Sequence, residues 1–529
     1  MLPCQTGGTC PCHALSQAVN ELAAAKALVE RLTLNICRLK AAINASHDPL
    51  VNCLPRELAS RIFTFCLPST TDQRPNPYRY PTDYSTANTL GSVCTAWRYI
   101  AFSTPQLWNV LSIQLHSAHR ASILQHIETY HRRSGALPLT IRIHTHRHEN
   151  LSKFASEMFY PIIDALNLHS HRWQTLEMCI PFSLTSMLHG SHTSGAPQLK
   201  NLTIHTDSRF IGPRSRIGFG AHHQLIRPAT VSLRGLCLKA VRIDWGHVVQ
   251  VDVEALRVNE CLELLRLAPT LTVFNIDVVL DDDENADEST SLVTHHSLKA
   301  WQFPFWGPSF ILCDRLVLPA LESLWVSWGG LHHSHIEGLL TRSACRLLHF
   351  CITDAEYTTQ ILVPLLRLMP HLENLKIIGL TNHSEINELC VVLARTSAFP
   401  ANSNHSTLFL PRLETFHCNG QGPVWAMVPS LFPPADKEPH MHYRPLSTVH
   451  FEVDDDPSQE NGYYIDRDII PELLDVVHRG FDLKVACIFE QGEDFIEASR
   501  QHHNLLDRKA DPNVEDYGER ILRIIHVHM

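Results

Sequence analysis

Histidine-rich segments are the parts of this sequence whose residue types and spacing could do metal chemistry. His144, His146 and His148 alternate in a strand-like run, so their imidazoles would share one face of a strand. Three imidazoles on one face can bind zinc or copper. No carboxylate or cysteine is placed to complete a tetrahedral site. The pattern therefore favours a solvated sheet face opposite Ile141 and Ile143, with a metal site as the alternative.

Two further groups contain residue types that can bind a metal. For both, the pattern favours a structure without one. The run His332, His333 and His335 also favours a solvated surface. The N-terminal group has C-x5-C-x-C-H spacing, which is not that of a recognised zinc module, in a short Gly/Pro-rich segment. Its members are Cys4, Cys10, Cys12 and His13. We expect a flexible tail over residues 1–13, and neither a metal nor a cofactor.

Signatures of catalysis are missing from the sequence. It holds no G-x-S-x-G elbow, no phosphate-binding G-x-x-x-x-G-K-[ST] loop, no H-E-x-x-H helix and no kinase motif set. We therefore expect a protein that is not an enzyme. The acidic runs at 281–284 and 454–456 each follow a predicted strand end. They favour solvated loops, with attraction of a basic substrate as the alternative.

Composition limits the class of protein. The chain has 529 residues, 44% of them hydrophobic and 19% charged, with a formal net charge of −10. This size predicts two to four domains of about 150 residues each, and the acidic balance argues against nucleic-acid binding. No apolar run approaches the roughly 18 residues of a membrane span. Scattered cysteines and the absence of a secretory pattern predict a cytoplasmic or nuclear protein.

Residues 14–46 carry a clear helical pattern. Apolar residues recur in steps of three and four, which predicts an a/d seam over about four heptads. The a positions are Leu15, Leu22, Val29, Ile36 and Ile43, and the d positions are Ala18, Ala25, Leu32 and Leu39. Either this helix packs against the next helices of its own chain, or residues 14–45 self-associate. Glu21 at g and Lys26 at the following e suit a parallel dimer, whereas the small Ala at two d positions weakens one.

Residues 50–110 form a second block with helical spacing. It contains L-P-R-E-L at 54–58, I-F at 62–63, L-G-S-V-C-T-A-W at 90–97 and S-T-P-Q-L-W at 103–108. The intervening segment 69–89 holds prolines and many small polar residues, which predicts an inserted loop. A loop extension costs little closure entropy, so the flanking apolar halves can still form one helical unit.

From about residue 137 the pattern changes to short strand-like runs of the form Leu-x-x-Leu-x-hydrophobic. They include the segments 199–204, 253–258, 271–276, 298–303, 321–326, 372–377, 413–418 and 446–451. Pro-bearing turns precede many of these runs, and helix-like segments such as 261–267 and 361–368 precede several. Stacked units of helix, turn and strand would bury a continuous core and align the strands in a parallel sheet. The period is irregular, so an ordinary α/β domain is the alternative.

The combination of these motifs resembles the F-box proteins of mushroom-forming fungi, with a degenerate leucine-rich-repeat-like domain behind the F-box. This resemblance implies an α/β fold class: a long N-terminal helix (14–46) and an all-α F-box (50–110), then an irregular leucine-rich-repeat-like solenoid (111–490) with a parallel sheet. Residues 491–529 would form a C-terminal helical segment or tail.

The same resemblance implies a non-catalytic substrate-recognition subunit of a Skp–cullin–F-box ubiquitin ligase. Its F-box would bind the Skp adaptor of the cullin complex, and its repeat domain would bind a substrate protein. The residues implied in adaptor binding are Leu54, Pro55, Leu58, Ile62, Phe63, Val93, Cys94 and Trp97. The alternative is a coiled-coil plus solenoid interaction scaffold with no role in ubiquitin transfer.

Overall fold

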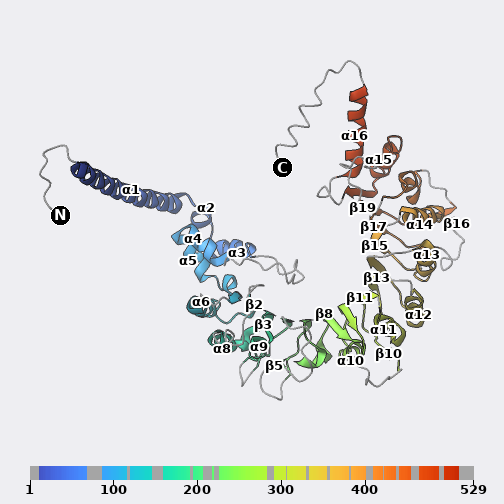
Figure 1. Cartoon of the computed structure of the whole chain (residues 1–529), viewed down its shortest axis with the longest axis horizontal. Helices are drawn as coiled ribbons and strands as arrows, with labels where there is room; N and C mark the ends of the chain where they lie inside the picture. The colour runs from blue at the N-terminus through green and yellow to red at the C-terminus, as the bar shows by residue number, and fades with distance from the viewer. Residues whose placement is uncertain are drawn as a thin grey trace. The chain divides into compact units, whose positions relative to one another are not determined.

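The structure is a computed structural model, and Figure 1 shows the whole chain. It describes residues 11–67, 86–115, 120–145, 159–190, 195–206, 217–219, 225–282, 291–305, 307–328, 333–353, 358–380, 383–400, 409–420, 422–435, 440–453, 464–487 and 494–510. The chain divides into two compact units. Unit 1 comprises residues 1–199 and 219–224, and unit 2 comprises residues 200–218 and 225–529. The division falls inside the predicted repeat domain.

Unit 1 begins with helices. They are α1 (Pro11–His47), α2 (Pro49–Asn52), α3 (Arg56–Phe65), α4 (Thr86–Val93), α5 (Thr95–Ser103) and the 3-10 helix η1 (Pro105–Trp108). The predicted helix over 14–46 is confirmed, and it starts earlier, at Pro11. Of the predicted inserted loop 69–89, residues 69–85 lie outside the described residues. The prediction is wrong for residues 86–89, which belong to α4, because Ala87 and Gly91 bury one face of that helix.

Helix α1 is exposed along its whole length. Every α1 side chain that the structure describes is exposed, including the apolar residues of the predicted seam. The interpretation in which this seam packs against the following helices of the chain is therefore wrong for the described side chains. Self-association of the helix stays a prediction.

A short parallel sheet follows the helices of unit 1. Its strands are β1 (Val110–Leu115), β2 (Leu139–Thr145) and β3 (Trp173–Cys179), with helices α6 (Arg120–Arg133) and α8 (Tyr160–Asn167) in the connections. The predicted alternation in β2 is confirmed at Ile141 and Ile143, which are buried, and at His144, which is half-buried on the other face. His146 and His148 lie outside the described residues.

Unit 2 is built around a large parallel sheet of eleven described strands. In pairing order the strands are β4 (Asn201–His205), β6 (Thr230–Arg234), β8 (Gln250–Arg257), β9 (Val273–Leu280), β11 (Ala300–Phe305), β13 (Ser323–Trp328), β14 (His349–Thr353), β15 (Asn374–Leu380), β17 (Thr415–Gly420), β19 (Thr448–Val453) and β20 (Asp482–Cys487). Neighbours in this order follow one another along the chain, apart from short strands of minor sheets. Mixed α/β architecture with a long N-terminal helix and a parallel sheet is thereby confirmed.

Helices occupy many of the connections in unit 2. They are α10 (Val258–Leu267), α11 (Ser309–Arg315), α12 (His333–Ser343), α13 (Thr359–Arg367), α14 (His383–Arg395), α15 (Ile470–His478) and α16 (Phe495–Ala510). Figure 1 shows α10 to α14 along one side of the strands. The helices predicted at 261–267 and 361–368 are α10 and α13. Of the predicted C-terminal segment, the described part is α16.

A hydrogen-bonded turn precedes several strands of unit 2. The amide of a buried leucine donates to the carbonyl three residues earlier, at Leu271 (3.0 Å), Leu321 (3.2 Å), Leu372 (3.1 Å) and Leu413 (3.3 Å). Proline occupies the second position of each turn, where its fixed φ suits the backbone. Each strand begins two residues after that leucine. The predicted segments therefore start two residues early, because their first leucine is buried in the turn instead of the strand.

A buried arginine joins two connections in the C-terminal half of unit 2. Arg444 is 1% exposed and follows β18 (Met441–Tyr443), which pairs with β16 (Ala398–Pro400). Its guanidinium donates to the carbonyl oxygens of Leu393 (2.7 Å), Leu410 (2.9 Å) and Phe409 (2.8 Å) and to the Thr396 hydroxyl (2.8 Å). Burial lowers the pKa of Arg444 to about 10. This side chain satisfies carbonyl groups that irregular backbone leaves without strand partners.

Replacing Arg444 by Met should destabilise unit 2 strongly. The substitution keeps an apolar stem but leaves several buried carbonyl oxygens without donors, and each costs about 1–3 kcal/mol. We expect the free energy of unfolding in urea to fall by at least about 3 kcal/mol. Arg395→Met, at an exposed arginine at the end of α14, is the matched control and should change it by less than about 0.5 kcal/mol. Equal effects of the two substitutions would contradict this role for Arg444.

A buried histidine in unit 1 gives the fold a pH dependence. His131 of α6 is 7% exposed and stacks on His169, with 3.8 Å between ring centroids. Burial, and then the nearby charges of His169, Arg172 and His171, lower the pKa of His131 to about 3. Since the ring stays neutral in the folded state below the usual histidine pKa of about 6.5, the unfolded state binds the extra proton first.

Stability from this site should therefore fall as the pH drops from about 6.5 toward 3. At pH 5.5 an unfolded histidine is mostly protonated, which costs the folded state about 1.4 kcal/mol relative to pH 8. His131→Phe keeps a stacked ring but cannot take up a proton. Urea unfolding measures the free energy of unfolding of both proteins at pH 8 and at pH 5.5. Its decrease between the two pH values should be about 1.4 kcal/mol smaller in the variant. Identical pH dependence in the two proteins would refute the assignment.

Candidate functional site

The helices α2 to α5 and η1 form the only part of the described chain where the predicted site residues gather. Phe63 of α3 contacts Trp97 of α5, with 4.9 Å between ring centroids. Phe63 is 1% exposed, so this contact lies in the interior of the helical cluster. The Trp97 indole N–H donates to the carboxylate of Asp48, whose other oxygen caps α2 by accepting from the amide of Leu50 (2.9 Å). The hydrogen bond between Trp97 and Asp48 thus links α5 to the start of α2.

The ends of α5 are fixed by short-range contacts. Cys94 is the N-cap residue of α5, and its Sγ accepts from the amide of Trp97 (3.4 Å). Past the C-terminal end of the helix, the Thr104 hydroxyl donates to the carbonyl oxygen of Ile100 (2.7 Å) and lies within hydrogen-bond distance of the Ser60 hydroxyl of α3 (3.0 Å). Trp108 is buried, and its indole N–H donates to the carbonyl oxygen of Ala101 (2.9 Å). These contacts hold α3, α5 and η1 together without using the outer face of α3.

Helix α3 is apolar on two faces. Ala59 and Phe63 are buried against the cluster. Leu58, Ile62 and Phe65 follow each other at steps of four and three, so they form one outward stripe, and they are 48%, 38% and 76% exposed. A helix that is apolar on one face needs one partner, whereas a helix that is apolar on two faces needs a second. We call these three side chains, with Val93 of α4 and Tyr99 of α5, the apolar surface of the cluster; Val93 is 51% and Tyr99 58% exposed.

An open pocket of about 320 Å³ lies on the same cluster. It is lined by Leu50, Val51, Leu54, Arg56, Ala96, Tyr99 and Ile100. The Arg56 guanidinium lies over the Tyr99 ring, 4.5 Å from its centroid, and also donates to the Tyr99 hydroxyl (3.3 Å). The pocket therefore has apolar walls and one cation held against an aromatic rim, features that suit an inserted side chain of a protein partner.

The structure divides the predicted site residues into three groups. Pro55, Leu58, Ile62 and Val93 are exposed, whereas Leu54, Cys94 and Trp97 are half-buried. A direct contact role for Phe63 is wrong in this structure, because the ring is buried between α3 and α5. Cys94 and Trp97 have structural roles as a helix cap and a core anchor. Sequence reasoning missed Phe65 and Tyr99 as surface residues, although Phe65 lies seven residues after Leu58 and so on the same face.

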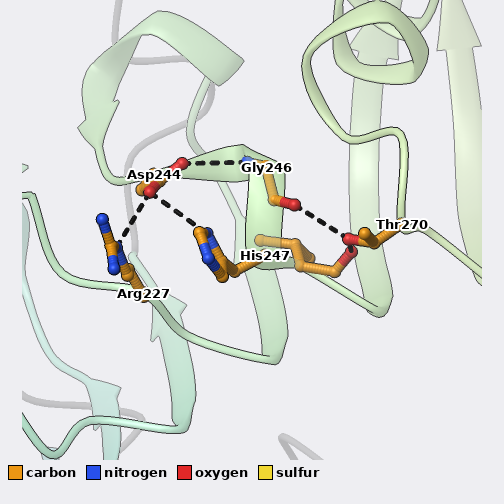
Figure 2. A network of polar contacts seen from close by, with 6 residues as sticks. Arg227, Asp244, Gly246, His247 and Thr270 are labelled. Atoms are coloured by element: carbon orange, nitrogen blue, oxygen red, sulfur yellow. Dashed lines mark hydrogen bonds and ion pairs between the residues drawn. The ribbon is translucent and has the colours of Figure 1, made fainter.

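A polar cluster in unit 2 also brings together an aspartate, a histidine and a hydroxyl. Figure 2 shows Asp244 between Arg227 (3.1 Å) and His247 (3.2 Å), with its other oxygen on the amide of Gly246 (3.1 Å). The Thr270 hydroxyl, however, donates to the carbonyl oxygens of Gly246 and Val248 (3.0 Å each). Its proton is used by the backbone, so the cluster fixes the turn before β8 and does not form a nucleophile with its base.

The acidic runs and the remaining segments rich in histidine or cysteine have structural partners or lie outside the described residues. Asp282 accepts from the amide of Asn259 at the start of α10 (3.0 Å), so part of the first acidic run supports a helix. His335 lies on α12, where it pairs with Asp314 of α11 (2.8 Å). Residues 454–456, Cys4, Cys10 and His332 are not among the described residues. Within the described parts of the chain, no group of three or more His, Cys, Asp or Glu side chains could hold a metal ion.

Comparisons with known proteins add no family assignment. A scan against protein-family models and a search of curated proteins both found no match. Across the described helices, none combines the length and apolar character that crossing a bilayer requires.

Replacing Trp97 by Phe tests the internal anchor of the cluster. The variant keeps a ring against Phe63 but loses the donor to Asp48, and hydrogen bonds to charged groups contribute about 1.5–3 kcal/mol. We expect the free energy of unfolding of unit 1, measured by near-UV circular dichroism, to fall by about 2 kcal/mol.

Asp48→Asn supplies the control, because asparagine also caps helices well. The double variant should lose little beyond Trp97→Phe, since both changes act on one bond. Fully additive losses would show that the two side chains are not coupled.

Proposed function

We propose that this protein is the non-catalytic substrate-recognition subunit of a Skp–cullin–F-box type ubiquitin ligase. The helical cluster of unit 1 binds the Skp adaptor, and the sheet domain of unit 2 binds a substrate protein. The observation that carries this proposal is the second apolar face of α3. It lies in the segment whose motifs resemble an F-box, and no described part of the chain covers it.

The exposed apolar and aromatic side chains of the apolar surface have the chemistry of a protein contact. Full burial of a Leu, Ile or Phe side chain contributes about 1.5–3 kcal/mol each, so a partner that covers this surface gains several kcal/mol. Aromatic residues at such surfaces often contribute most of the binding energy, and here Phe65 and Tyr99 are the exposed aromatic rings. Behind the surface, the Phe63–Trp97 contact and the Asp48 bond hold α3 and α5 in place, so that little ordering cost accompanies binding.

In this proposal unit 2 is an irregular leucine-rich-repeat-like solenoid. Parallel pairing of consecutive strands, with helices α10 to α14 on one side, supports this interpretation (Figure 1). On the opposite face the strand registers align one row of side chains across the sheet. The row comprises Thr203, Ser232, Asp252, Asn275, Gln302, Trp325, Cys351, Lys376, His417, His450 and Lys484.

The polar character of this row suits the recognition of a protein substrate. Carboxylate and amide groups stand at one end and Lys and His at the other, with Trp325 between them. The receptor would hold the substrate near the charged enzyme, so that ubiquitin transfer is promoted by effective concentration without bond chemistry on this chain.

The direct test is binding of the full chain to a purified Skp-type adaptor by calorimetry. Ile62→Asp places a charge in the centre of the apolar surface, and we expect the Kd to rise by about 100-fold, which corresponds to about 2.7 kcal/mol. Leu58→Asp should act similarly. Gln125→Asp introduces the same charge at an exposed position of α6 in the same unit and should leave the Kd unchanged.

Circular dichroism of each variant checks that the helices stay folded. Failure of the wild-type chain to bind the adaptor, while a standard F-box protein binds under the same conditions, would refute the proposal. The scaffold alternative would then be favoured, because it requires partners for unit 1 but no adaptor.

A further inference from the structure

Helix α1 exposes more large apolar side chains than α3 does, and it is a separate element of the structure. Helix α1 has 37 residues, which corresponds to about 55 Å of helix. Its large apolar side chains are between 44% and 72% exposed. Seven of them form a single stripe: Leu15, Leu22, Val29, Leu32, Ile36, Leu39 and Ile43. A long helix of this kind has little stability of its own in water, because most helical stability comes from packing an apolar face.

The residue types within the stripe specify the kind of partner. In the second half of α1 the a positions hold the β-branched residues Val29, Ile36 and Ile43, and the d positions hold Leu32 and Leu39. β-Branched residues at a with leucine at d favour two parallel strands, because of the way each knob fits the facing hole. The first half has Ala at both of its d positions, so the second half supplies most of the contact.

The charges beside the stripe select the same arrangement. Glu21 occupies a g position and Lys26 the following e position. In a parallel dimer each g side chain faces the e side chain of the next heptad on the partner, so Glu21 of each copy meets Lys26 of the other. In an antiparallel dimer g faces g and e faces e, and neither pair forms. Glu21 also accepts a hydrogen bond from Gln17, one turn earlier on the same helix (3.0 Å).

We propose that a second copy of this chain covers α1, and that residues 15–43 form a parallel two-stranded coiled coil. The apolar stripe, the order of β-branched residues and leucine, and the complementary g and e charges all fit an identical partner in register. The proposal does not depend on the adaptor-binding role of α3, since the two surfaces lie on different helices. A dimer would present two copies of unit 1 and of unit 2 from one shared helix pair.

Sedimentation equilibrium of the full chain tests the stoichiometry. We expect a mass twice the 59.9 kDa of the chain. Leu32→Asp places a charge at a central d position and should raise the dimer dissociation constant at least 100-fold. Leu34→Asp is the matched control: the same change, two residues away, at an f position that points away from the seam, where the native leucine is 72% exposed. It should leave the mass unchanged.

Disulfide cross-linking tests the orientation. In a parallel dimer the two copies of residue 39 face each other, so Leu39→Cys should give a covalent dimer on mild oxidation. Ala41→Cys, on the outer face, should not. Both are made after replacing the N-terminal cysteines and the exposed described ones by Ser: Cys4, Cys10, Cys12, Cys37, Cys53 and Cys66.

A monomer at all concentrations, a trimer, equal loss in the two Leu→Asp variants, or failure of Leu39→Cys to cross-link would each overturn the proposal. Adaptor binding by the monomeric Leu32→Asp variant gives a separate readout. It should keep the wild-type Kd per chain, so that loss of self-association and loss of adaptor binding are distinguished.

Discussion

The positions of β9, β13, β15 and β17 in unit 2 depend on the hydrogen-bonded turn that precedes each of them. At Leu321, for example, the amide bonds to the carbonyl of Leu318 across Pro319, the leucine side chain enters the core, and β13 begins two residues later. Because side chains alternate along a strand, a shift of one residue would turn Leu324 and Val326 outward and expose the polar face to the core. The same turn before β9, β15 and β17 helps to keep the rows of side chains aligned across the sheet, despite connections of unequal length.

Because the connections differ in length, some of their buried backbone carbonyl groups have no hydrogen-bond partner in a strand. Two buried arginines donate to several of these groups. Arg444 bonds to carbonyls of two segments in unit 2, at Leu393 and at 409–410, and Arg172 in unit 1 bonds to the carbonyl of Leu137 and the hydroxyl of Ser134. A planar guanidinium offers five donors in a fixed fork, so one side chain can replace several backbone bonds. Burial without a carboxylate is tolerated because carbonyl oxygens surround the charge.

The fold was largely predictable from periodicity, and its details were not. Spacing of three and four residues located α1, and the Leu-x-x-Leu-x-hydrophobic runs located eight strands, because both patterns are local consequences of burying one face. Seven of these segments start two residues too early, because a buried leucine in a turn and one in a strand look the same in sequence. The eighth, 253–258, starts three residues too late, since β8 begins at Gln250. The site was less predictable. Phe63 and Ile62 are adjacent apolar residues of one helix, and only the packing against Trp97 decides which of them faces inward.

The exposed apolar side chains are distributed unevenly, and this distribution links the two proposals. In the described part of unit 2 they are few and scattered, such as Leu267, Ile311 and Val477. Isolated residues of this kind are normal on any protein surface. In unit 1 many of them lie on two ordered stripes, one along α1 and one along α3. Since large contiguous apolar patches are uncommon on monomeric proteins, these stripes lead us to expect partners for the first hundred residues. The two stripes differ in kind. That of α1 has heptad order, which an identical helix can match, whereas that of α3 is short and sits beside a pocket and a cation held on an aromatic ring, which suit a different protein.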